Sequence, residues 1–280
     1  GTAGFAHVSC LAEQAKILYA EAEENNKDDN QWHRWYKCGL CKQDYHGVVA
    51  CALGWACWKT YVGRPEADQT RQFAMGALGN GLHLAKHSED ALPVQEAVLS
   101  MLRRIGASEE YILAIQNNLA VTYDQQGRLE SAQQMYRDVY SGYLKLHGEE
   151  HYQTLVSANN YANALVNLGH FEEGKALLRK TTLVARRVLG ESEFITLRMQ
   201  WIYALALYKS TGATLDDCRD AVTTLEDAQR IARRVLGGSH PLAIDIEGSL
   251  RYARAALAAR EGADVSTVCE GLAAMTPGGA

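Results

Sequence analysis

Residues 117–127 read NNLAVTYDQQG, and residues 159–169, which lie 42 positions further on, read NNYANALVNLG. Both stretches carry apolar residues at helical spacing and end in a glycine, a pattern typical of a helix that stops at a turn. The same offset pairs Gly106 with Gly148 and Gly148 with Gly190. An internal repeat of this length indicates a helical solenoid, in which each unit buries its apolar face only by stacking on its neighbours.

Each unit divides into two helices. In the unit 108–149, the pattern predicts a first helix from Ser108 or Glu109 to Gln126 and a second from Leu129 to His147. A helix from Pro241 to Glu261 is expected to cap the open end, and the tail 263–280 is expected to be disordered. Four units fit the sequence, at 66–107, 108–149, 150–191 and 192–239, within one repeat domain that spans 66–262.

Composition excludes several classes of protein. The formal net charge of −5 is the wrong sign for a phosphate-neutralising nucleic-acid binder. The longest apolar run, residues 48–58, is far shorter than the roughly 20 residues that span a membrane, so we expect a soluble, cytoplasmic protein. The sequence contains no phosphate-binding glycine loop, no H-E-x-x-H motif and no nucleophile elbow, so no catalytic residue is predicted.

The small and aromatic residues around the glycine turn resemble the tetratricopeptide repeat. The 42-residue length, the Asn-Asn-Leu-Ala opening at 117–120 and the ending LGGSHP at 236–241 are similar to its kinesin-light-chain subclass. The resemblance implies an all-α protein: a right-handed α-solenoid of about four helix-turn-helix repeats. It also implies a concave groove lined by the first helix of each unit.

Asparagines recur on these first helices. A carboxamide offers two donors and one acceptor, so a row of asparagines can hold the backbone of an extended peptide from a protein partner. Asparagine is also a mediocre helix former, which argues against a choice for helix stability alone. The alternative is that these amides bond to neighbouring helices and hold the solenoid together. The candidate peptide-binding residues are Asn80, Asn117, Asn118, Tyr123, Asn159, Asn160, Asn163 and, where the groove turns apolar, Trp201.

The cysteines point to metal. Five of the seven lie within the first 57 residues, and an odd count argues against a disulfide framework. His7 and Cys10 form an H-x2-C pair, and Cys38 and Cys41 form a C-x2-C pair. Zinc takes four nitrogen or sulfur ligands, often in pairs spaced this way. The remaining cysteines, at 51, 57, 218 and 269, are expected to pack in the core.

Residues 4–11 (GFAHVSCL), a helix from Leu11 to Glu24 and residues 35–45 (WYKCGLCKQDY) resemble the second half of a RING-CH (RING-variant) zinc finger. The resemblance assigns the pair His7/Cys10 and the pair Cys38/Cys41 to different Zn²⁺ ions, with the other ligand pairs upstream of Gly1. The residues 1–62 would then be a partial zinc-binding segment, and the chain a piece of a longer product. A single site made of all four ligands stays open.

Three functions follow from these two resemblances. The first is a protein–protein interaction scaffold whose groove binds a peptide. The second is a RING-CH-type E3 ubiquitin-protein ligase with an E2 ubiquitin-conjugating enzyme as a further partner; here Gln14 stands where the family has tryptophan, a departure that puts ligase activity in doubt. The third, weaker one is a kinesin-light-chain-like cargo adaptor.

Basic and histidine pairs have structural explanations. Arginine pairs end three of the second helices, where cations complement the negative end of the helix dipole; an acidic partner is the alternative. They are Arg103-Arg104, Arg186-Arg187 and Arg233-Arg234. His83 and His87 have i,i+4 spacing that could bind metal, but without a third ligand nearby we predict a packing or surface role.

Overall fold

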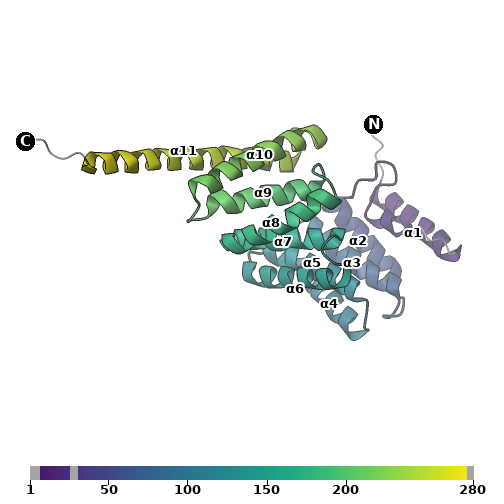
Figure 1. Ribbon diagram of the computed structural model, residues 1–280. Helices are drawn as coiled ribbons and strands as arrows, with labels where there is room; N and C mark the ends of the chain where they lie inside the picture. The colour runs from purple at the N-terminus through teal and green to yellow at the C-terminus, as the bar shows by residue number, and fades with distance from the viewer. Residues whose placement is uncertain (1–6, 26–30, 276–280) are drawn as a thin grey trace, which may run out of the picture. The chain divides into compact units, whose positions relative to one another are not determined.

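The computed structural model describes residues 7–25 and 31–275, with side chains described up to residue 262. These residues form eleven α-helices and one 3-10 helix (Figure 1). Their only extended pairing is a single antiparallel bridge between Lys37 and Asp44. The prediction of an all-α protein is confirmed.

The chain divides into two compact units, residues 1–135 and 136–280, and the division falls inside α6 (Leu129–His147). The sequence predicts instead one repeat domain over 66–262. Repeats of this kind contact only their neighbours, so a row of them has no single shared core that would forbid such a division.

Unit 1 contains an N-terminal part and the first repeats. The N-terminal part consists of α1 (Val8–Glu24), the 3-10 helix η1 (Trp32–Trp35) and α2 (Gly47–Tyr61). It is followed by α3 (Gln69–Leu84), α4 (Ser88–Arg104) and α5 (Glu109–Gln125). The predicted ends of α5 and α6 agree with the structure to within a residue at each end.

The predicted N-terminal segment 1–62 packs directly against α3, the helix that follows it. Helix α2 packs closely on α3, because Gly54 and Gly81 let the two backbones touch. A Cβ atom on Gly81 would lie 2.6 Å from the carbonyl oxygen of Ala50. Tyr19 and Trp35 also share one buried cluster with Ala74 of α3. The N-terminal residues are therefore part of the core of unit 1.

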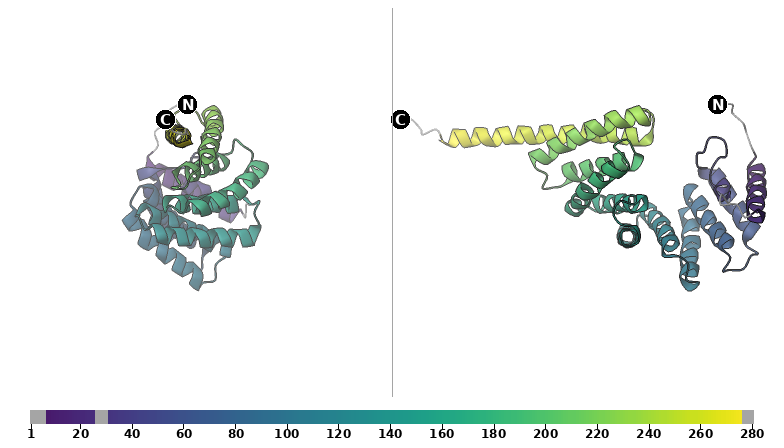
Figure 2. Two further views of the ribbon diagram at one scale, coloured as in Figure 1. Left: turned by 60° about the vertical axis from the view of Figure 1, so that its left-hand side comes forward. Right: turned by 45° about the vertical axis from the view of Figure 1, so that its right-hand side comes forward.

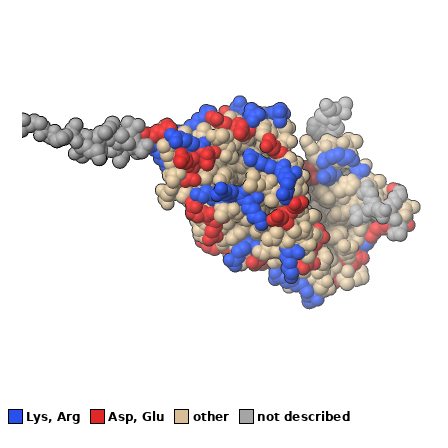
Figure 3. Space-filling view, in the orientation of Figure 1, with Lys and Arg blue, Asp and Glu red and all other residues tan. Residues whose placement is uncertain are grey.

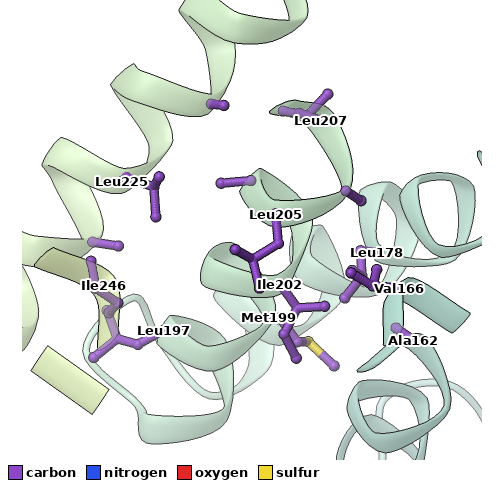
Figure 4. Close-up of a cluster of buried hydrophobic side chains, with 14 of the residues drawn as sticks. Ala162, Val166, Leu178, Leu197, Met199, Ile202, Leu205, Leu207, Leu225 and Ile246 are labelled. Carbon is purple, nitrogen blue, oxygen red and sulfur yellow. The ribbon is translucent and has the colours of Figure 1, made fainter. Parts of the chain in front are cut away.

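Unit 2 contains α7 (Tyr152–Asn167), α8 (Phe171–Val188), α9 (Phe194–Lys209), α10 (Leu215–Val235) and α11 (Pro241–Met275). Its core is a single large cluster around α9, in which Leu197, Met199 and Ile202 are completely buried (Figure 4). Helix α11 runs well past the ends of α9 and α10 (Figure 2). It continues to Met275, so the predicted end at Glu261 and the predicted disorder of 263–275 do not agree with the structure; residues 276–280 lie outside the described residues.

The arginine pairs end their helices as predicted and also make ion pairs. Arg104 pairs with Glu66 in unit 1, and in unit 2 Arg187 pairs with Glu150 (2.6 Å) and Arg233 with Glu247 (2.8 Å). On the face shown in Figure 3, basic and acidic side chains lie beside one another. These contacts favour the structural explanation of the arginines over an acidic-partner patch.

Candidate functional site

Unit 1 contains a cavity of about 510 Å³. Helices α3 and α5 form one side of it, and the segment from η1 to the start of α2 contributes the other residues. A volume in this range is typical of sites that bind a ligand. Most of its lining is apolar, and six of the lining residues are aromatic: Trp32, Trp35, Tyr36, Tyr45, Phe73 and Tyr111.

Three of these rings form a row from η1 across α3 to α5. The ring centroids of Trp32 and Phe73 are 5.7 Å apart, and those of Phe73 and Tyr111 are 5.1 Å apart with the rings nearly perpendicular. Such edge-to-face pairs add to the stabilisation from burial alone. The Tyr111 hydroxyl donates a hydrogen bond to the carbonyl of Gln72 (3.2 Å), so this wall of the cavity is held in place.

Two of the predicted asparagines meet in this cavity. Asn118 Nδ2 on α5 donates to Asn80 Oδ1 on α3 at 2.9 Å. The bond leaves the Nδ2 donor of Asn80 and the Oδ1 acceptor of Asn118 without a protein partner. A free donor beside a free acceptor matches the C=O and N–H of a peptide backbone.

The register that joins Asn80 to Asn118 differs from the predicted one. Asn118 lies 38 positions after Asn80, whereas the repeat offset in the sequence is 42.

His83 lines the same cavity and belongs to a hydrogen-bonded chain. Its Nε2 accepts from Gln125 Nε2 (3.3 Å), and its Nδ1 lies 3.1 Å from Thr122 Oγ1. Thr122 in turn donates to Gln95 Oε1 (2.7 Å). This chain is satisfied by a neutral imidazole that carries its proton on Nδ1. Burial lowers the pKa of His83, which favours the same neutral form. The packing role predicted for His83 fits these contacts.

The depressed pKa of His83 predicts that unit 1 loses stability in mild acid. The unfolded chain takes up the proton near the ordinary histidine pKa of about 6.5, whereas the folded chain resists it. The stabilisation is therefore fully present above pH 6.5 or so and is lost as the pH falls through the folded pKa. Urea unfolding between pH 7.5 and 5 measures this loss, and His83→Gln should reduce it. The exposed His87, changed to Gln, is the control and should leave the pH dependence as it is.

A hairpin at residues 36–45 closes the N-terminal side of the cavity. Tyr45 N–H donates to the Tyr36 carbonyl (2.7 Å), and Cys38 N–H donates to the Gln43 carbonyl (2.8 Å). The base of the hairpin supplies Tyr36, Asp44 and Tyr45 to the cavity, and its tip carries Cys38 and Cys41.

The tip has the form of a metal-binding knuckle. The Cys38 sulfur accepts hydrogen bonds from the backbone N–H groups of Leu40 and Cys41, and these bonds lower the pKa of the Cys38 thiol. Lys42, the next residue, has a positive φ of 61°, which completes the tight turn. Hydrogen bonds to the thiolate favour the deprotonated form that binds metal.

The other predicted zinc ligands lie at the start of α1. His7 is the N-cap residue of that helix, and Cys10 is exposed on its first turn. Among the described residues, no three His, Cys, Asp or Glu side chains gather closely enough to hold a metal ion. The four predicted ligands thus stand as two separate pairs, and each pair provides half of the ligands that zinc requires.

Cys57 and Cys218 are completely buried, so their predicted core role is confirmed. Cys51 is half-buried, and the Cys269 side chain lies outside the described residues. Burial raises the pKa of the Cys57 thiol, which makes it unreactive.

Two further candidates on α5 lie beside the asparagine pair. Asn117 is half-buried next to Asn118. Tyr123 is nearly buried, its hydroxyl donates to Glu96 (2.9 Å) on α4, and Arg128 covers its ring at 4.1 Å. These contacts make Tyr123 part of the packing between α4 and α5.

The predicted peptide-binding residues of unit 2 differ in how deeply they are buried and in what they contact. Asn159 is completely buried, and its Nδ2 donates to Asn160 Oδ1 (3.2 Å), so the structure puts Asn159 in the core rather than on an open groove. Asn160 and Asn163 are half-buried on α7. Trp201 donates through Nε1 to Ser249 of α11 (2.8 Å), so its indole N–H is used in a contact with the last helix.

The hairpin residues of the cavity are the part of the site that the sequence analysis misses. Four aromatic residues fall within residues 32–45, and this density is the signal that the sequence offers. The zinc-finger interpretation uses the same residues for a different purpose. Spacing along the chain does not show that the aromatic rings face α3 and α5.

Comparisons with known proteins concern the repeats and the fold. The tetratricopeptide repeat family matches residues 72–145 and, overlapping them, residues 111–182. Residues 72–182 are thus similar to tetratricopeptide repeats. The matched residues begin at 72, so the resemblance of residues 4–45 to a RING-CH finger stays a prediction. No curated protein matches the sequence.

Two solved structures share the fold of this repeat protein. A putative kinesin light chain with nearly identical TPR-like repeats from Podosopora anserina is 18% identical, with a TM-score of 0.54 over 82% of this chain and 98% of that one. BtubC (BKLC) from P. vanneervenii is 14% identical, with a TM-score of 0.55 over 99% of this chain and 96% of that one. Kinesin-light-chain-like structural neighbours are thus confirmed, and at these identities the likeness concerns the fold. None of the helices in the described residues combines the length and apolarity needed to cross a bilayer.

Proposed function

We propose that this chain is a protein–protein interaction scaffold and that the cavity of unit 1 binds an extended peptide of a partner protein. The observation that carries the proposal is the Asn80–Asn118 pair, bonded at 2.9 Å with one donor and one acceptor left over. Both helices that carry it belong to repeats, and both asparagines line a cavity with aromatic walls. The backbone of a peptide supplies the missing acceptor and donor, and its side chains meet the rings.

The size of the cavity also supports a peptide. At about 510 Å³ it lies within the range of pockets that bind ligands, so it has room for a short part of a peptide. Its walls are tied by hydrogen bonds at Tyr111 and His83 and by the backbone bonds of the hairpin. A site held open in this way loses little conformational entropy on binding.

The proposal predicts that Asn118→Ala weakens peptide binding about tenfold, or ~1.4 kcal/mol, because the alanine removes the acceptor and also frees Asn80 from its fixed position. Peptides selected from a random dodecapeptide phage library on the 280-residue chain would be synthesised, labelled with fluorescein and titrated by fluorescence anisotropy. Asn80→Ala should weaken the same peptides. Asn167→Ala, an exposed asparagine at the end of α7, is the matched control.

Two results would contradict this proposal. The first is a selection that yields no peptide above background on the intact chain. The second is a set of selected peptides that bind Asn118→Ala as tightly as they bind the Asn167→Ala control, with both variants folded by circular dichroism.

We also propose that the Cys38–Cys41 knuckle ligates Zn²⁺, as the predicted zinc-finger segment requires. The support is the pair of N–H bonds to the Cys38 sulfur and the tight turn at Lys42. Zinc binds thiolates well, and C-x2-C spacing can place two of them at two corners of a tetrahedral site. His7 and Cys10 would serve a separate ion, as the resemblance to the zinc finger implies.

The zinc proposal predicts that Cys38→Ser lowers the apparent affinity of the chain for Zn²⁺ at least tenfold, since hydroxyl is a poor substitute for thiolate. Competition with a fluorescent zinc indicator under reducing conditions measures the affinity. Cys51→Ser is the control, because Cys51 belongs to α2 and is outside the knuckle. An equal affinity in the two variants would show that Cys38 is not a ligand.

A further inference from the structure

The lining of the unit 1 cavity contains one acidic residue, Asp44, which comes from the hairpin and not from the repeat helices. Among the lining residues that the structure describes, Asp44 is the only one with a carboxyl group. No lysine or arginine is among the residues that line the cavity in the described part of the chain. The remaining lining is aromatic, aliphatic or carboxamide.

Asp44 is fixed in position but has acceptor capacity to spare. Its backbone pairs with Lys37 in the bridge at the base of the hairpin. Its carboxylate lies 3.7 Å from Lys37 Nζ, a pair in which both side chains are substantially exposed. An exposed ion pair at that distance contributes little, so a ligand cation competes for the carboxylate readily.

The aromatic walls favour the same kind of occupant. A cation near the face of Trp, Tyr or Phe is attracted by the ring electrons. Lysine and arginine also carry long apolar stems that pack on rings while the charged head reaches a carboxylate. Tyr36 and Tyr45 flank Asp44 on the hairpin, and their backbones are joined by the 2.7 Å hydrogen bond.

We propose that the cavity takes a basic side chain of the bound peptide, arginine in preference to lysine, with its head on Asp44 and its stem against the rings of the hairpin. The inference rests on the proposed function, because it names the residue that the peptide places there. Arginine is preferred because its planar guanidinium bonds a carboxylate through two N–H groups and stacks on rings. An apolar side chain would fill the same space but would leave the carboxylate without a partner.

Fluorescein-labelled octapeptide pools test this choice. Each pool fixes the fourth residue as Arg, Lys, Leu, Trp or Glu, and the other positions hold an equal mixture of Ala, Ser, Thr, Asn and Leu. Anisotropy titration of the 280-residue chain should show that the Arg pool binds at least fivefold more tightly than the Leu pool, and the Glu pool most weakly. Asp44→Asn should remove that preference, and Asp90→Asn, an exposed carboxylate on α4, should preserve it.

Two more variants separate the parts of the site. Lys37→Ala should strengthen binding of the Arg pool about twofold, because Lys37 no longer competes for Asp44. Tyr36→Leu should weaken the Arg pool more than the Leu pool, while Tyr36→Phe keeps the ring and the preference. The Tyr36 side chain is 46% exposed and is not among the buried core residues, so we expect these changes to leave the core intact.

The outcomes distinguish this inference from the function on which it rests. If pools bind and Asn118→Ala weakens them, but Leu or Trp is preferred or the Arg preference survives Asp44→Asn, the basic-residue inference is overturned and the peptide groove stands. If no pool binds the intact chain, the peptide-binding function and this inference both fall.

Discussion

Changing Gly81 to alanine will destabilise unit 1 by about 2–3 kcal/mol, although alanine is the better helix former. The new Cβ atom would lie 2.6 Å from the Ala50 carbonyl oxygen and 3.1 Å from its carbon. Both are backbone atoms of α2, so no side chain can rotate away to make room. The two helices must move apart, and the packing around Cys57 and Leu78 loosens with them.

The same substitution at Gly248 of α11 is the control for Gly81→Ala. Nothing lies within 4 Å of a Cβ atom at that position, so alanine should gain about 0.5–1 kcal/mol there from helix propensity alone. Urea unfolding followed by tryptophan fluorescence measures both variants, because four of the five tryptophans lie in unit 1 and Trp201 lies in unit 2. A stabilised Gly81→Ala variant would show that α2 and α3 do not touch as described. Since Gly81 lines the cavity, peptide binding should fall together with stability.

The second large effect is expected in unit 2, where Ile202→Ala should cost about 3–4 kcal/mol. Ile202 is completely buried at the centre of the cluster that joins α9 to its neighbours (Figure 4). Truncation removes three heavy atoms from a close-packed site, and the side chains around it can fill the space only in part.

Ile244→Ala, on α11, is the matched control for Ile202→Ala. The side chain of Ile244 is 54% exposed, so its loss should change the stability by less than about 1 kcal/mol. Trp201, the tryptophan of unit 2, is hydrogen-bonded to Ser249 and reports the unfolding of this unit in a background without the other four tryptophans. Equal costs for the two isoleucine variants would mean that α9 is not at the centre of the core.

The repeat architecture was predictable because its signals are local. Gly127 and Gly148, both with positive φ, end α5 and α6 where the pattern places the turns. Apolar spacing also identifies Leu119, Ala120 and Val139, all buried, without any knowledge of distant residues. Helix type, helix ends and buried faces depend on residues a few positions apart, which a single sequence displays.

The candidate site was predictable only in part. The asparagine pattern identifies Asn80 and Asn118, which the structure joins in one cavity. The same pattern also selects Asn159, which is buried, and Tyr123, which packs against α4. Neighbouring positions on a helix face differ by 100° or so, and a small rotation of one helix against the next decides which of them reaches open space.

The sequence by itself determined that this is an all-helical protein built of tetratricopeptide-like repeats, because periodic apolar residues and glycine stops specify helices locally. Only the tertiary structure decided that the hairpin of Tyr36, Asp44 and Tyr45 faces α3 and α5 across a cavity. That arrangement depends on the close contact of α2 with α3 at Gly54 and Gly81. Contacts between residues so far apart in sequence arise from shape and packing, and they leave no periodic signal in the chain.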